Sequence, residues 1–172
     1  RLVDLVNESV DCAIRIGELS DSSLVSVRLG DNRRVVVASP DYIAKFAVPL
    51  APDFLSEHNC LSLRQQRGWT LRVEGEVRAI KVGGSFECND GAVLHDWALA
   101  GKGLAWRSLW EVGADIAAGR LVTVLGEFAA PPVGIHAVVP QRRHLPLRVR
   151  LFIDLLKATW RDPGYWATAA GA

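Results

Sequence analysis

The sequence predicts an α/β fold, and three observations support this prediction. Short apolar or alternating segments that favour strands recur along the chain. Between them lie segments whose apolar residues have helical spacing, several opened by a capping residue and closed by glycine. Apolar residues make up 49% of the 172 residues and charged residues 23%, as in ordinary globular proteins. This length suffices for one domain or two small lobes with a proper core.

The first third of the chain predicts a helix, three strands and a second helix. Apolar residues already have helical spacing within residues 1–10, so we expect a chain cut from a longer protein. Strands are predicted over residues 10–16, 24–29 and 34–38. Ser39 is the predicted N-cap of the next helix, because Pro40 fits the first helical position, where a missing N–H costs nothing.

The remainder alternates strands with helices. A helical turn over 53–58 precedes a short strand over 60–63, and residues 69–73 and 77–82 predict a β-hairpin. Asn89 is the predicted cap of a helix that runs to about Ala100, where the following glycines end it. The last predicted elements are strands over 104–106, 121–125 and 133–139 and helices over 109–118 and 146–160.

Charge and motifs exclude several classes of function. With 20 Lys and Arg against 19 Asp and Glu, the net charge of +1 gives this chain no basic footprint for DNA. No apolar run approaches a membrane span. The histidines lack metal-ligand spacing, and neither a nucleophile elbow nor a phosphate loop occurs, so we predict no enzyme and no cofactor. Four arginines, which we interpret as a solvated face, lie near the last helix: Arg142, Arg143, Arg148 and Arg150.

The three cysteines, Cys12, Cys60 and Cys88, are widely spaced and lie in apolar or strand-like contexts. Buried thiols in a reducing cytoplasm are the favoured interpretation, and the alternative is one disulfide with a spare thiol.

An ordered series of short segments covers nearly the whole chain up to Trp160. The segments are Asp11–Gly17, Val35–Tyr42, Asp53–Leu61, Asn89–Gly91, Ala100–Ala105, Ala118–Val122 and Pro140–Leu156. Each segment alone is weakly specific, but their order and spacing resemble those of the effector-sensing domain of LysR-type bacterial transcription regulators.

This resemblance implies an α/β fold like that of type II periplasmic binding proteins, with two Rossmann-like lobes joined by two crossover strands. Residues 1–62 and 140–172 would form lobe I, and residues 63–139 lobe II. Two departures stand out. The family's winged helix-turn-helix and the first strand–helix–strand of lobe I are absent from this chain, and Arg107-Ser108 stands where many members have a proline after the strand.

The resemblance also implies a small effector in the cleft between the lobes, and the residues suggest an anionic one. A helix that begins near Asn89, Asp90 and Gly91 would bind a carboxylate or phosphate through free backbone N–H groups, unless it is merely capped. Ser39 offers a second such helix end, with the same alternative.

Four further residues are candidates for effector contact, each with a structural alternative. Arg15 could clamp a carboxylate or pair with a nearby aspartate, and Trp106 could wall the effector or pack in the core. Gly17 and Gly103 would allow close backbone approach or merely turn the chain.

The sequence therefore predicts the effector-sensing and oligomerising part of a cytoplasmic LysR-type regulator. It would form homodimers or homotetramers through the helices at 41–45 and 90–100, and would reach DNA only through an N-terminal winged helix-turn-helix outside this chain. The rival interpretation is a stand-alone solute-binding protein of a transporter, which the unpaired cysteines disfavour.

Overall fold

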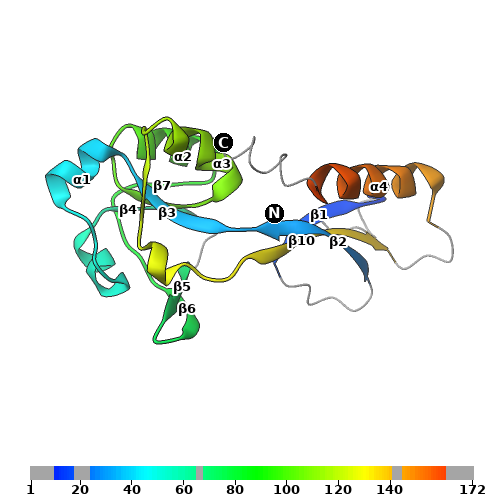
Figure 1. Cartoon of the computed structure of the whole chain (residues 1–172), viewed down its shortest axis with the longest axis horizontal. Coiled ribbons are helices and arrows are strands. Elements are labelled where there is room, and N and C mark those ends of the chain that lie inside the picture. The colour runs from blue at the N-terminus through cyan, green and yellow to red at the C-terminus, as the bar shows by residue number, and fades with distance from the viewer. Residues whose placement is uncertain (1–9, 18–23, 65–67, 141–144, 162–172) are drawn as a thin grey trace. The chain divides into compact units, whose positions relative to one another are not determined.

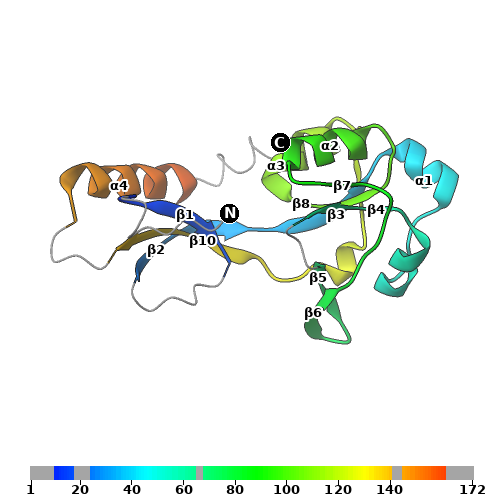
Figure 2. The same cartoon turned by 180° about the vertical axis from the view of Figure 1, so that it is seen from behind.

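The computed structural model describes residues 10–17, 24–64, 68–140 and 145–161, and its mixed α/β elements form two compact units (Figures 1 and 2). The first unit contains the described residues up to Asn32 and from Pro132 onward, and the second contains those from Arg33 to Pro131. Most of the helix predicted at 1–10 lies outside the described residues, of which Val10 is the first. Arg142, Arg143 and residues 162–172 lie outside them as well.

The first unit is a three-stranded antiparallel sheet covered by one helix. The strand order is β1-β10-β2. Val149 and Ile153, one turn apart on α4, pack against strand residues that include Leu29, Ala137 and Val139. The bounds of the elements are β1 (Ala13–Ile16), β2 (Leu24–Asn32), β10 (Val133–Pro140) and α4 (Leu147–Arg161).

The second unit is built on a five-stranded mixed sheet of order β7-β4-β8-β3-β9. Strands β7, β4 and β8 are parallel, while β3 runs antiparallel to β8 and to β9. The strands are β3 (Arg34–Ala38), β4 (Cys60–Leu63), β7 (Glu87–Cys88), β8 (Leu104–Ser108) and β9 (Val122–Val124), and a separate hairpin pairs β5 (Trp69–Val73) with β6 (Glu76–Ile80). The helices are α1 (Pro40–Phe46), α2 (Gly91–Leu99) and α3 (Leu109–Ala117), with 3-10 turns at Pro52–Glu57 and Gly126–Phe128.

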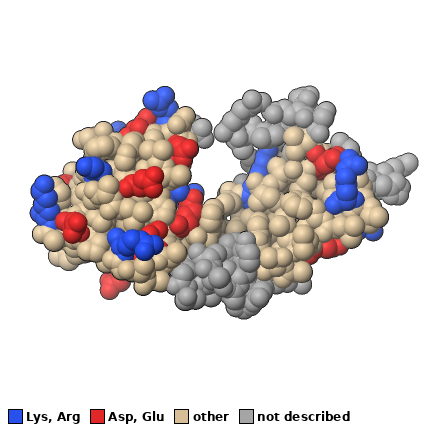
Figure 3. All heavy atoms as spheres, turned by 90° about the horizontal axis from the view of Figure 1, so that it is seen from above, with Lys and Arg blue, Asp and Glu red and all other residues tan. Residues whose placement is uncertain are grey.

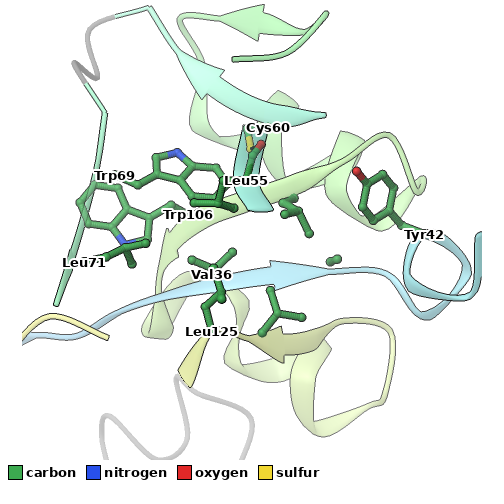
Figure 4. Close-up of a cluster of buried hydrophobic side chains, with 11 residues drawn as sticks. Val36, Tyr42, Leu55, Cys60, Trp69, Leu71, Trp106 and Leu125 are labelled. Carbon is green, nitrogen blue, oxygen red and sulfur yellow. Dashed lines mark hydrogen bonds between the residues drawn. The ribbon is translucent and has the colours of Figure 1, made fainter. Parts of the chain in front are cut away.

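Both faces of this sheet are buried. Successive side chains of β3 and β8 point to opposite sides, so each of these strands contributes to both faces. On one face α2 and α3 pack over Val37, Leu61 and Ala105. On the other face Val36 and Trp106 lie in a cluster completed by Trp69 and Leu71 of the hairpin (Figure 4). The apolar run of β3 is thus explained by a strand covered on both faces.

The boundaries of the compact units differ from those of the predicted lobes. The sequence places residues 33–62 in lobe I, but β3 and β4 pair with β8 and lie in the second unit. Residues 133–139 are placed in lobe II, but β10 pairs with β1 and β2 in the first unit. The change of texture after residue 62 marks the hairpin, whereas strand pairing across long sequence separations fixes the units. The assignment of two regulatory lobes stays a prediction.

Candidate functional site

One edge of the sheet in the second unit gathers the ends of all three parallel strands. Strands β4, β7 and β8 end at Leu63, Cys88 and Ser108. Helix α2 begins three residues after β7, and α3 follows β8 without a linker. In open α/β sheets ligands bind at the carboxyl ends of strands, and helix N-termini that meet there favour anions. This strand-end edge is the candidate site.

The N-terminus of α2 is capped by Asp90, whereas the sequence predicts Asn89 as the cap. The Asp90 Oδ1 accepts hydrogen bonds from the backbone N–H groups of Ala92 at 2.7 Å and Val93 at 3.4 Å. Both Asn and Asp are good caps, so residue type alone could not choose between adjacent positions. Asn89 is exposed beside this cap, and Gly91 is the first helical residue.

The guanidinium of Arg107 lies next to Gly91. An added Cβ at Gly91 would come within 2.7 Å of Arg107 Nη2 and 3.2 Å of Nη1. Arg107 is only 6% exposed, and its Nη2 donates to Glu111 Oε1 at 2.7 Å. The other carboxylate oxygen of Glu111 accepts from the backbone N–H of Ser108 at 3.0 Å, so Glu111 joins the start of α3 to Arg107.

Arg107 is not among the residues that the sequence singles out as candidates for effector contact. One signal was its departure from the proline that the family resemblance leads us to expect near this position. An arginine at the end of a buried strand is a stronger signal, because arginine is rarely fully buried without a partner.

Arg34 and Trp106 also lie near the strand-end edge, but on the face of the sheet opposite α2 and α3. The Arg34 guanidinium carbon lies 4.3 Å from the centroid of the Trp106 ring, within cation–π range. Burial lowers the pKa of Arg34, the carboxylate of Glu111 opposes this, and the charge of Arg107 adds to it. Trp106 is 9% exposed and lies in the core cluster of Figure 4, where it packs as a core residue.

Ser39 and Gly103 lie at the opposite end of the same sheet, because β3 runs antiparallel to β8. The buried Ser39 Oγ accepts from the backbone N–H of Tyr42 at 3.2 Å, which confirms the predicted cap of α1. A Cβ on Gly103 would collide with the backbone carbonyl of Asn59, so glycine permits β8 to begin beside β4. The structure therefore separates these two residues from Asn89, Asp90 and Gly91.

Arg15 and Gly17 belong to the first unit. Arg15 lies in β1 opposite His136 of β10. Gly17 has φ of +102°, a conformation that L side chains rarely adopt, and its N–H donates to Gly134 O at 3.0 Å. The effector contacts predicted for these two residues stay predictions.

The cysteine thiols are free at Cys12, Cys60 and Cys88. Cys60 is fully buried, and burial raises its pKa to about 12. Across the described ranges, three or more His, Cys, Asp or Glu side chains nowhere gather as a metal site would require. No helix in the described part of the chain has the length and apolarity to cross a membrane. On the face drawn in Figure 3, acidic and basic side chains are intermixed.

Comparisons with known proteins agree on one family. The model of the LysR substrate binding domain matches residues 1–161. The HTH-type transcriptional regulator DmlR of Escherichia coli K12 is 39% identical over 161 residues, which are 91% of this chain and 52% of that protein. The activator TtdR of Escherichia coli K12 is 33% identical over 162 residues, again 52% of its length. The chain therefore spans about half the length of these relatives.

Solved structures give the same result. The regulatory domain of CrgA from Neisseria meningitidis, a LysR-type regulator, superposes with a TM-score of 0.79 at 31% identity, covering 90% of this chain and 78% of that one. Full-length AphB, a virulence activator from Vibrio cholerae, superposes with a TM-score of 0.80 at 26% identity, covering 93% and 55%. These relatives are transcription regulators rather than enzymes or solute-binding proteins of transporters, and their effector domains have the type II periplasmic-binding-protein-like fold. The chain belongs to the LysR substrate-binding domain family.

Proposed function

We propose that this chain senses a small anionic metabolite on behalf of a LysR-type transcription regulator, and that the strand-end edge of the second unit contributes to the effector site. One observation carries the proposal: the N-termini of α2 and α3 meet there around the buried guanidinium of Arg107. Positive helix ends together with a desolvated cation favour an anion.

The family supports a proposal for the rest of the regulator's activity. DNA binding would reside in an N-terminal winged helix-turn-helix outside this chain, and the protein would act in the cytoplasm as a homodimer or homotetramer. The effector would change operator binding by its differential affinity for two arrangements of the protein, because a ligand that binds both equally shifts nothing. The intact mass of the native polypeptide tests whether a DNA-binding domain is attached. Light scattering of the purified protein tests its oligomeric state.

The effector is found by titrating the chain calorimetrically with a panel of metabolites in which each carboxylate has a matched neutral amide. We expect saturable binding of a carboxylate and none of its amide. Binding of a neutral compound in preference to every anion would contradict the proposal.

The variant Gly91→Asp tests the position of the site. Its carboxylate would occupy the space beside Arg107 and repel an incoming anion, so we expect effector affinity to fall by about tenfold or more. Gly126→Asp is the matched control, because it adds the same charge in the second unit where a Cβ meets nothing within 4 Å. Equal affinity in Gly91→Asp and the parent chain would exclude this edge.

A further inference from the structure

Arg107 carries unused hydrogen-bonding capacity in a buried position. A guanidinium has five N–H donors. In Arg107, Nη2 donates to Glu111, while the buried Nε has no partner among the described residues. A buried donor without a partner destabilises the folded state. Such a cost is commonly retained at positions that receive a ligand or a bound water.

The surroundings of Arg107 favour an anion. The first helical residue of α2 lies against the guanidinium, so this cation sits at the positive end of a helix, which disfavours it. Two carboxylates lie nearby, and both are engaged: Asp90 caps α2, and Glu111 divides its oxygens between Arg107 and the backbone of Ser108. The charge of Glu111 also opposes the lowering of the pKa of Arg34 by burial, so this one carboxylate acts on two guanidinium groups.

We infer that Arg107 is the specificity-determining residue of the proposed effector site, and that its guanidinium binds a carboxylate or another oxyanion of the effector beside the N-terminus of α2. Gly91 allows the guanidinium to lie against the first turn of α2, since any larger residue would place its Cβ within 2.7 Å of Arg107 Nη2. Glu111 is the internal counter-ion with which the effector competes. The inference rests on the proposed function and deepens it.

A purely structural role for Arg107 makes a different prediction. If the residue only links the end of β8 to the start of α3 through Glu111, then removing either partner weakens the same contact, and neither change raises affinity for an anion. If Arg107 binds the effector, the two variants have opposite effects. Arg107→Leu removes the guanidinium that binds the anion. Glu111→Gln removes the competing negative charge, and glutamine can still accept the hydrogen bond from the backbone N–H of Ser108.

The experiment titrates the ¹⁵N-labelled chain with sodium acetate and with sodium sulfate, with sodium chloride of equal ionic strength as reference. The Gly91 amide and the Arg107 Nε–H resonances report on the site. We expect saturable shifts with acetate or sulfate but not with chloride. Arg107→Leu should weaken anion binding by about tenfold or more, and Glu111→Gln should tighten it by about two- to fivefold. Arg78→Leu, which removes an exposed arginine from the hairpin, is the matched control.

Each outcome decides the role of Arg107. The inference that Arg107 binds an oxyanion is overturned if neither acetate nor sulfate gives a saturable shift at these resonances. It is also overturned if anion affinity is unchanged in Arg107→Leu. If the metabolite panel yields a carboxylate effector that Arg107→Leu still binds normally, the proposed function stands and only this inference fails. If the panel yields no anionic effector, the proposed function fails, while the acetate and sulfate titrations still decide whether Arg107 binds oxyanions. Should Arg107→Leu unfold, the sign of the Glu111→Gln effect decides instead.

Discussion

At the scale of single residues, the same residue type performs different tasks according to its neighbours. Gly103 allows two strands to start side by side, Gly17 supplies a positive φ, and Gly91 allows a guanidinium to lie against the first turn of a helix. The sequence singles out all three glycines but gives no means of telling these tasks apart. Arg107 is the converse case, because its importance appears only once the two helix starts are placed around it.

The buried thiol of Cys60 gives a prediction at this scale. Its pKa in the folded chain is about 12, against an ordinary value of 9.0, because burial penalises the thiolate. The folded state therefore holds the proton more tightly, and its contribution to stability is lost as the pH rises from about 9 towards 12. We expect the melting temperature of the parent chain to fall more steeply over this range than that of Cys60→Ala. Parallel curves would show that this thiol does not couple ionisation to folding.

At the scale of elements, local chemistry fixes where most helices and strands begin. Ser39-Pro40 is a strong helix start, and α1 begins there with the predicted cap. The strand periodicities likewise locate β3, β4 and β5 at their predicted residues. Boundaries set by pairing partners are different: β2 reaches Asn32, three residues past the predicted end, because β10 continues to pair with it.

The cap of α1 provides the prediction at this scale. Ser39→Ala leaves the backbone N–H of Tyr42 without its buried acceptor, so we expect a loss of about 1 kcal/mol in the free energy of unfolding. Effector affinity should not change, because Ser39 lies at the end of the sheet away from Arg107. Denaturant unfolding and calorimetric titration measure both effects, and Ser56→Ala, at an exposed hydroxyl, is the control. A loss of effector affinity in Ser39→Ala but not in Ser56→Ala would show that Ser39 contributes to the effector site.

At the scale of the whole molecule, charge governs what the chain can bind. The net charge of +1 offers little of the counterion release that drives non-specific DNA binding. We therefore expect the 172-residue chain at physiological salt to leave the mobility of a random-sequence DNA duplex unchanged at micromolar protein. Retardation of the duplex would show that the chain itself contributes a DNA-binding surface.

The sequence by itself determined the α/β class, nearly all of the elements and the family, because these depend on periodicity, capping and the order of short motifs. Only the tertiary structure decided which strands pair, and with them the boundaries of the two compact units and the membership of the candidate site. The antiparallel direction of β3 carries Ser39 away from Gly91, and the parallel direction of β8 brings Arg107 to it. Strand direction and order are set by contacts between residues far apart in the chain, so local sequence patterns do not predict either of them.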